Sequence, residues 1–371
     1  MKNTLVFGFV TLLLLGLALP MLSATTAHAA TCTPTGFFRD SINMTAVLIN
    51  PPGVVSGDVN ATGCNIGVYY DTGTKKVHGA KVHGSNYFGI VVNGDVHNVK
   101  VDIDDSQVYQ IGEVPFNGTQ HGGAVYYRAF GTGTAKGKIE GNSISLYQKG
   151  GITANGTGTD VNIKDNRVNG LGPVPFIAQN GIQIGFGANG SVKDNTVTGN
   201  AYTGANFASS GGILIVGGPC YGLPEYTVGT NVVNNKLVGN DVGVFVSNLD
   251  ASCNAPPVPT NVKVVDNDIR NGAVTNTTGN GTGPYQAGVS DQGNGDKITS
   301  NDICGAGYDP ANQPVGGVVT WIDVSSTNNP SVHGNHLGCG RGDDSHDDDG
   351  DHGHGEGHGH KAPGHEGKDN D

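Results

Sequence analysis

The sequence predicts an all-β fold in which short strands stack as the coils of a single-stranded parallel β-helix. Two short phrases recur along the chain, and each keeps an apolar residue at a fixed strand position. No segment between them carries apolar residues at helical spacing. Of the 371 residues, 62 are glycine and only 14% are charged, without a Gly-X-Y period. An all-helical protein and collagen are therefore both excluded.

The first phrase is a glycine followed by an apolar-x-apolar strand. It occurs nine times, at Gly67, Gly89, Gly123, Gly151, Gly181, Gly212, Gly243, Gly288 and Gly317. The next residue is always apolar: Val68, Ile90, Ala124, Ile152, Ile182, Ile213, Val244, Val289 or Val318. Because alternate residues of a strand point to the same face, this column is expected to face the core.

The second phrase is apolar-x-x-Asn-x-apolar and lies between the glycine phrases. Its central residues are Asn142, Asn166, Asn195, Asn235, Asn267, Asn301 and Asn335. Asparagine tolerates the left-handed backbone of a sharp turn, and stacked asparagine side chains can bond from layer to layer. The pattern predicts an asparagine ladder at one corner of the coils.

Two strand phrases in about 30 residues describe one coil of a parallel β-helix, and nine such coils are expected. Each coil buries its inner face only by stacking on its neighbours. A β-propeller would instead show hairpins, four strands to a repeat, at more regular intervals. A calcium-binding nonapeptide roll would need Gly-Gly-x-Gly-x-Asp runs, which are absent.

The chain begins like an exported protein. Lys2, the apolar run Leu5–Leu19 and Ala27-His28-Ala29 have the order of a signal peptide, assigned to residues 1–29. A membrane anchor is the alternative, although the run is short for a membrane span. No later segment is apolar enough to cross a bilayer, so a secreted protein without a span in the mature chain is expected.

The six cysteines form three sequential pairs, namely Cys32 and Cys64, Cys220 and Cys253, and Cys304 and Cys339. Zinc ligation would require Cys-x-x-Cys spacing, which is absent. An even count in an exported chain favours disulfides, although six cysteines permit about 15 connectivities. Because Cys304 and Cys339 follow consecutive ladder asparagines, stacking would bring them together.

Phrases such as Val-Lys-Asp-Asn-Thr-Val at 192–197 and Val-Val-Asp-Asn-Asp-Ile at 264–269 resemble those of the right-handed parallel β-helix repeat proteins, the pectin-lyase-like superfamily. The resemblance covers about residues 60–339, within a β-helix domain assigned to 30–339. It implies architecture rather than one activity. The theme that it implies is an extracellular polysaccharide as partner.

The sequence lacks the catalytic motifs of two enzyme classes within that superfamily. Polygalacturonase-like enzymes use Asn-Thr-Asp and Arg-Ile-Lys, which are missing here, and Gly-His-Gly occurs only near the C-terminus. Pectate-lyase-like enzymes need an Arg-x-Pro-x-x-Arg segment and a calcium cluster, and no arginines are so arranged.

Loop lengths predict a notch at the fourth coil. From the ladder position to the next repeat glycine there are 17 residues after Ser106, 9 after Asn142 and 15 after Asn166. Val-Pro-Phe occurs on both sides of the short loop, so Phe116 and Phe176 are predicted to form walls. The predicted polar floor consists of His121, Lys149 and Gln179, with Gln120 and Gln148 beside them.

A groove with aromatic walls and a polar floor suits an extended sugar chain. If the sugar is a uronate, Lys149 could act as base, Arg128 could neutralise the carboxylate, and Tyr127 or His121 could return a proton. The alternatives are that Phe116 and Phe176 plug the core and that Lys149 is a solvated charge. A second short turn, at 235–243, is the next place for a site.

Residues 340–371 have no apolar pattern and are predicted to be disordered. Their histidines, which include His352, His354, His358 and His360, alternate with carboxylates in a way that suits Zn²⁺, Ni²⁺ or Cu²⁺. A solubilising tail is the alternative, and no cofactor is certain. The formal net charge of −12 argues against a nucleic-acid partner.

Two functions from different classes remain open on sequence alone. One is a glycan-active or glycan-binding protein, in the enzyme case related to polysaccharide lyases, that works in the notch. The other is a non-catalytic surface or matrix protein whose rigid rod displays loops. Acidic and basic groups that converge at the notch would favour the first.

Overall fold

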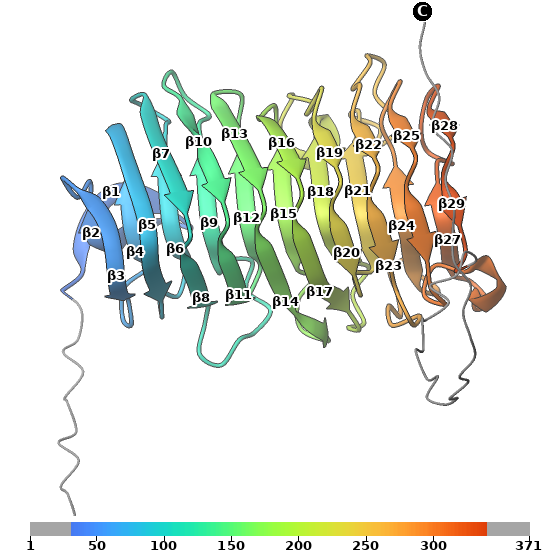
Figure 1. Ribbon diagram of the computed structural model, residues 1–371, viewed down its shortest axis with the longest axis horizontal. Coiled ribbons are helices and arrows are strands. Elements are labelled where there is room, and N and C mark those ends of the chain that lie inside the picture. The colour runs from blue at the N-terminus through green and yellow to red at the C-terminus, as the bar shows by residue number, and fades with distance from the viewer. Residues whose placement is uncertain (1–30, 340–371) are drawn as a thin grey trace, which may run out of the picture. The chain divides into compact units, whose positions relative to one another are not determined.

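The computed structural model describes residues 31–339, and its strands stack in chain order as the coils of a parallel β-helix (Figure 1). The first sheet has 11 strands: β1 (Thr33–Arg39), β2 (Ile42–Ile49), β4 (Ile66–Tyr70), β6 (Phe88–Asn93), β9 (Gly123–Arg128), β12 (Gly150–Asn155), β15 (Asn180–Gly185), β18 (Gly211–Gly217), β21 (Val242–Asn248), β24 (Tyr285–Asp291) and β27 (Val318–Asp323).

The second sheet has 18 strands and bends at a corner in each coil. In the first two coils β3 (Val54–Asn60) and β5 (Gly73–His83) run through the corner, since β5 pairs with both of the strands that flank it in the next coil. In the other coils the strands before the corner are β7 (Val99–Asp104), β10 (Ala135–Glu140), β13 (Thr159–Lys164), β16 (Asn189–Lys193), β19 (Asn231–Val233), β22 (Lys263–Val265), β25 (Lys297–Thr299) and β28 (Ser331–His333). After it lie β8 (Gln107–Ile111), β11 (Ser143–Tyr147), β14 (Arg167–Val174), β17 (Thr196–Tyr202), β20 (Lys236–Val238), β23 (Asp268–Arg270), β26 (Asp302–Cys304) and β29 (His336–Leu337).

Two short 3₁₀ helices, η1 (Pro219–Tyr221) and η2 (Pro310–Asn312), lie in the loops. No helix among residues 31–339 has the length and apolar character needed to cross a membrane.

The predicted coils are present, and one further coil precedes them. Strand β2 stacks in parallel on β4 without the glycine phrase, which is why the pattern missed it. Strand β1 then pairs antiparallel with β2 and ends the parallel stack. Phe37 of β1 folds over the outer face, where its ring lies 6.1 Å from that of Tyr69 and 6.4 Å from that of Phe88.

One apolar residue per coil forms the expected inward column, with two changes of register. The column reads Leu48, Val68, Ile90, Val125, Ile152, Ile182, Ile213, Val244, Val289 and Ile322. The predicted members Ala124 and Val318 were therefore wrong, by one and by four positions. In β9, Ala124 and not Gly123 aligns with the repeat glycine of the neighbouring coils. In the last coil, Trp321 occupies that glycine position.

Close packing explains the repeated glycine. A Cβ on Gly151 would lie 2.5 Å from Val168 Cγ1 and 2.5 Å from the carbonyl oxygen of Gly181. Gly67 and Gly89 face the same obstruction, from Val82 and Val108. Each of these valines follows the corner of a coil, so the two phrases meet in space where the coil closes onto the next strand of the first sheet.

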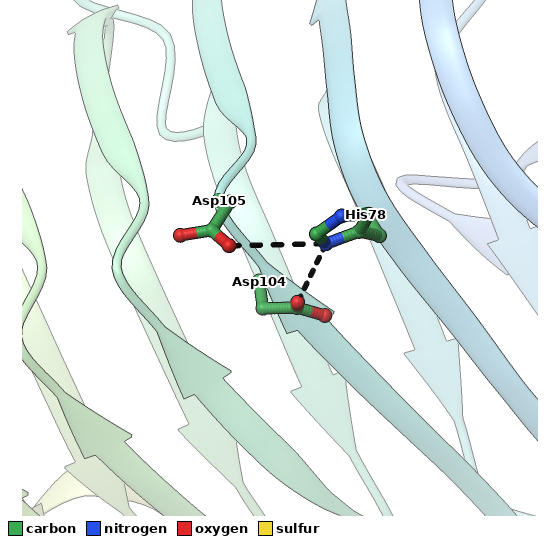
Figure 2. A group of neighbouring side chains, drawn as sticks. All are labelled: His78, Asp104 and Asp105. Atoms are coloured by element: carbon green, nitrogen blue, oxygen red, sulfur yellow. Dashed lines mark hydrogen bonds and ion pairs between the residues drawn. The ribbon is translucent and has the colours of Figure 1, made fainter.

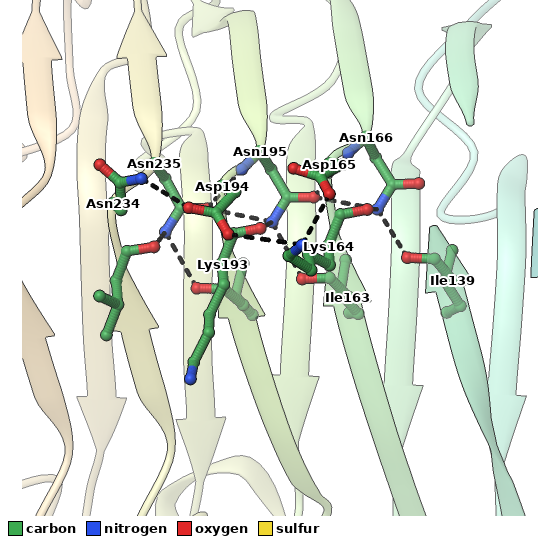
Figure 3. A network of polar contacts seen from close by, with 12 residues as sticks. Ile139, Ile163, Lys164, Asp165, Asn166, Lys193, Asp194, Asn195, Asn234 and Asn235 are labelled. Atoms are coloured by element: carbon green, nitrogen blue, oxygen red, sulfur yellow. Dashed lines mark hydrogen bonds and ion pairs between the residues drawn. The ribbon is translucent and has the colours of Figure 1, made fainter. Parts of the chain in front are cut away.

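All seven predicted asparagines form the ladder, together with Ser106 at its N-terminal end. Oδ1 of Asn195 accepts from the backbone N–H of Asn166 at 3.0 Å and from its Nδ2 at 2.9 Å, and the same pair of bonds links the other steps (Figure 3). The left-handed residue is the one before each asparagine, such as Asp165 or Asp194, and not the asparagine itself as predicted. The asparagine side chain thus stays free to bond along the stack.

The six cysteines form three disulfides, as the sequence indicated. Cys32 bonds to Cys64 with Cα atoms 5.4 Å apart, and Cys220 bonds to Cys253 with Cα atoms 5.0 Å apart. Cys304 and Cys339 are also disulfide-bonded, and no cysteine of the chain is free. Each of the first two bonds joins segments about one coil apart in sequence.

Candidate functional site

A cavity of 370 Å³ lies on the outer face of the first sheet, over β9, β12 and β15. It is lined by Arg39, Phe88, Gln120, His121, Gly123, Tyr126, Arg128, Phe130, Lys149, Gly150, Thr153, Asn155, Asn180, Gln183, Phe186 and Leu223. The middle strand, β12, belongs to the fourth coil of the glycine-phrase count, where the short loop predicted a notch. Four predicted site residues line this groove: Lys149, His121, Arg128 and Gln120.

Lys149 enters the groove from the residue just before β12. Its Nζ donates to the carbonyl of Ala178 at 2.8 Å, and none of the carboxylates in residues 31–339 forms an ion pair with it. Burial lowers the pKa of Lys149 to about 8, because the charged ammonium loses hydration. Near neutral pH this lysine therefore exists in both protonation states.

The other two cationic candidates are held by carboxylates and by rings. His121 Nε2 lies 2.7 Å from Glu113 Oε1, and its ring stacks on Tyr87 at 3.9 Å. The guanidinium of Arg128 lies 2.8 Å from Asp95 Oδ2. It also lies over the rings of Phe37 and Phe130, at 5.0 Å and 5.3 Å. Both side chains are thus fixed in orientation before any ligand arrives.

Three predicted residues lie inside the protein instead. Tyr127 is fully buried in the core, where its hydroxyl donates to the carbonyl of Val101 and burial raises its pKa well above the usual value. The amides of Gln148 and Gln179 are also fully buried. Gln148 bonds to the backbone of Glu113 and Thr119, and Gln179 bonds to that of Tyr147 and Leu171. Gln148 thus holds a loop in place and Gln179 bonds to β11 and β14, so we do not retain them as ligand contacts.

Comparison with known proteins agrees with this architecture. Residues 45–218 match the family model of the right-handed β-helix region. The chain is a right-handed parallel β-helix repeat protein. None of the curated proteins matches this β-helix protein. The matched segment contains β9, β12 and β15, so the groove lies within it.

The aromatic residues at the groove of the β-helix differ from the predicted ones. Phe116 and Phe176 are half-buried and do not line it. Phe88 and Tyr126 do, with ring centroids 5.1 Å apart, and Phe130 and Phe186 contribute two further rings. The Val-Pro-Phe repeat therefore marks the loops beside the notch rather than its walls.

Several lining residues of the β-helix escaped the sequence reasoning. Tyr126, Thr153 and Gln183 are aligned on β9, β12 and β15 and point outward. Counting alternate positions from the inward column would have found Thr153 and Gln183. The sequence reasoning chose Tyr127 where the structure has Tyr126, because the alignment at Ala124 was wrong by one residue. A shift of one residue assigns every side chain of a strand to the opposite face.

One group of side chains among residues 31–339 has the composition of a metal site, namely His78, Asp104 and Asp105 (Figure 2); none of the three lines the groove. His78 Nδ1 lies 2.6 Å from Asp104 Oδ2 and 3.8 Å from Asp105 Oδ2. Lys76 Nζ already lies 3.2 Å from Asp104 Oδ1, so a cation is present and we assign no metal here. The histidines proposed as metal ligands, His352 to His360, lie outside the described residues.

Proposed function

We propose that this β-helix protein is exported and binds an acidic polysaccharide in the groove on the outer face of its first sheet. The observation that carries the proposal is the charge of the lining. It contains Arg39, Arg128, Lys149 and His121 but no aspartate or glutamate; Asp40, Asp95 and Glu113 pair with Arg39, Arg128 and His121 from outside the lining, so Lys149 is the cation that a ligand would meet without a carboxylate partner. The whole chain has 32 acidic and only 20 basic residues, whereas the lining has two arginines and one lysine and no acid. Such a lining favours an anionic ligand.

The aromatic residues support a sugar as that ligand. The rings of Phe88, Tyr126, Phe130 and Phe186 offer apolar surface to pyranose rings, while the side chains of Thr153, Asn155 and Gln183 offer hydrogen bonds to hydroxyls. Three disulfides are typical of proteins from oxidising compartments, where such polymers are found. The same lining argues against glycoside hydrolysis, because that reaction uses a pair of carboxyl groups.

A binding screen tests the proposal directly. The full chain is titrated by calorimetry with polygalacturonate, alginate and hyaluronate, and with dextran as the neutral control. Lys149→Met is expected to weaken binding of the acidic polymers about ten-fold or more, since it removes the one groove cation without a carboxylate partner. Lys138→Met, on the exposed face of β10, should bind like the wild type. Equal binding of dextran, or full binding by Lys149→Met, would overturn the proposal.

Lyase activity is a second candidate, favoured by the lowered pKa of Lys149. In that reaction the neutral Nζ takes the proton beside the uronate carboxylate while Arg128 neutralises that carboxylate. The electron pair forms a carbon–carbon double bond, the glycosidic C–O bond breaks, and His121 protonates the leaving oxygen. Each turnover yields one unsaturated end that absorbs in the ultraviolet. If polygalacturonate, alginate and hyaluronate all bind without such absorbance, the protein is a non-catalytic glycan-binding rod.

A further inference from the structure

We infer that two walls, one with Arg39 of β1 and one with Leu223 of a disulfide-held loop, close the groove at both ends, so that it takes the end of an acidic polysaccharide and not its middle. This inference rests on the proposed function and adds which part of the ligand the groove selects. Strand β1 is called the N-terminal wall below, and the loop of residues 218–225 is called the C-terminal wall.

The open part of the outer face is three strands wide. One outward row of the first sheet reads Tyr126, Thr153, Gln183, Leu214 and Phe245 from β9 to β21. The first three residues line the groove, whereas Leu214 and Phe245 do not. The groove therefore ends between β15 and β18, although the sheet continues beyond them.

The C-terminal wall stands at that limit. The loop leaves β18 at Gly218, whose N–H donates to the carbonyl of Glu225 at 2.8 Å and closes the base of the loop. Of the described residues that follow Phe186, only Leu223 lines the groove. This side chain is half-buried and apolar, so it offers no hydrogen bond to the hydroxyls of a further sugar.

A disulfide holds the C-terminal wall in position. Cys220 in η1 bonds to Cys253 in the loop after β21, with Cα atoms 5.0 Å apart. The hydroxyl of Tyr221 lies 2.5 Å from Ser247 Oγ on β21. The loop is thus tied to a strand outside the groove. A wall that is fixed before the ligand arrives avoids the entropy cost of ordering it on binding.

The N-terminal wall closes the opposite end. Strand β1 pairs antiparallel with β2, and the Phe37 ring packs against Tyr69 of β4 and Phe88 of β6, at 6.1 Å and 6.4 Å. Arg39, the last residue of β1, lines the groove. Because β1 lies over these strands, a ligand cannot extend past them on the outer face.

Both walls lie outside the segment that matches the β-helix family model. Residues 45–218 include the floor strands β9, β12 and β15. Strand β1 precedes this segment, and Leu223 follows it. The walls are therefore features of this chain and not of the matched repeat.

The size of the groove agrees with a short ligand. Its 370 Å³ is close to the lower limit of ligand sites, which range over about 300 to 1,000 Å³. We expect room for about two or three sugar units. Lys149 precedes β12, the middle one of the three open strands, so it can meet the carboxylate of one of these sugars. The rest of the polymer then leaves the groove toward solvent.

The first experiment counts binding sites on polymers of different length. Polygalacturonate, alginate and hyaluronate are each separated into short and long fractions, and the full chain is titrated by calorimetry with equal masses of the two. If the groove takes chain ends, the protein bound per gram should fall in inverse proportion to chain length. Equal amounts of protein bound per gram by both fractions would overturn the inference.

The second experiment tests Leu223 with dimers to hexamers of each polymer. In the wild type the affinity should stop rising at about the trimer. Leu223→Ala should let the hexamer bind about three-fold or more tightly than the trimer. Joint replacement of Cys220 and Cys253 by alanine should do the same, because it releases the loop. Val228→Ala, at an exposed apolar residue that does not line the groove, is the matched control and should behave like the wild type.

The outcomes separate this inference from the proposed function. If the bound protein follows polymer mass while Lys149→Met still weakens binding, the proposed function stands and the closed groove is overturned. If it follows chain ends but Leu223→Ala and the double cysteine variant keep the length dependence of the wild type, the C-terminal wall is overturned. If the wild type binds none of the three acidic polymers, both fail.

Discussion

The corner with the asparagine ladder and the outer face of the first sheet are built from the same coils, but they differ in how their columns vary. Along the ladder the residue is asparagine in seven consecutive coils, with the same two bonds at each step. Where the chain enters each strand of the first sheet, the column two residues before the repeat glycine reads Lys149, Gln179, Ser210, Asp241 and Gln286; the last four are buried, and only Lys149 lines the groove on the outer face. In this β-helix the constant column holds the stack together, whereas the varied column bonds to loops and, under the proposed function, contributes Lys149 to the groove.

The largest effect is expected from a break in the constant column. Asn195→Ala removes the acceptor for Asn166 N–H and Nδ2, and it also removes the donor to the carbonyl of Ile163. Because these groups are buried, the free energy of unfolding should fall by about 3 kcal/mol or more in urea titrations. Asn162→Ala, at an exposed position of β13, should change it by about 0.5 kcal/mol or less. Similar losses from both variants would remove the distinction between the two kinds of column.

The same distinction explains how far the sequence alone could go. The ladder and the glycine phrase were predictable because each coil repeats one packing constraint, as Val168 does at Gly151. The coil of β2 has no glycine phrase, so nothing marked it. Of the predicted site, Lys149, His121, Arg128 and Gln120 line the groove.

The wrongly predicted site residues depend on strand register and on the local course of the backbone, which the repeated phrases do not specify. Tyr127 points inward because Ala124 shifts the alignment of β9 by one residue, and a local phrase cannot reveal that. Gln148 and Gln179 have the composition of a polar floor, but their amides turn inward: Gln148 bonds to the backbone of the loop that contains Thr119, and Gln179 bonds to that of β11 and β14. The course of that loop and the irregular register of β14 between Asn169 and Gly172 are not encoded in the repeat.

An effect of similar size, but dependent on pH, is expected at Asp241, in the varied column. Burial raises the pKa of this carboxyl to about 7, although the backbone N–H groups of Tyr202 and Ser210 donate to it. The folded state therefore holds a proton that the unfolded chain releases near pH 4. Its stabilisation is complete below that pH and is lost as the pH rises through about 7, so the free energy of unfolding should decline over this range.

Asp241→Asn tests this assignment, because the amide keeps an acceptor for the two N–H groups and does not titrate. Urea unfolding from pH 4 to pH 8 should show a shallower decline in the variant, by on the order of a few kcal/mol across the range. Some slope should remain, because burial also raises the pKa values of Asp291 and Asp296, whose carboxyl groups bond to each other. An unchanged slope would mean that Asp241 does not take up the proton.

The smallest effect, and the one that separates binding from chemistry, concerns Lys149 at the open end of the varied column. Its pKa of about 8 lies below that of a solvated lysine, since burial penalises the ammonium. Binding of polygalacturonate, alginate or hyaluronate needs that charge, so affinity should fall by a factor of about ten or less as the pH rises from 7 to 9. Lyase turnover needs the neutral amine and should rise over the same interval.

Lys149→Met should abolish either trend, and high salt should weaken binding without moving the pH midpoint of the affinity change far. An affinity that stays level from pH 7 to pH 9 in the wild type would place the ligand's charge away from Lys149, and Arg128 and Arg39, which stay charged throughout, would then be the residues that hold it.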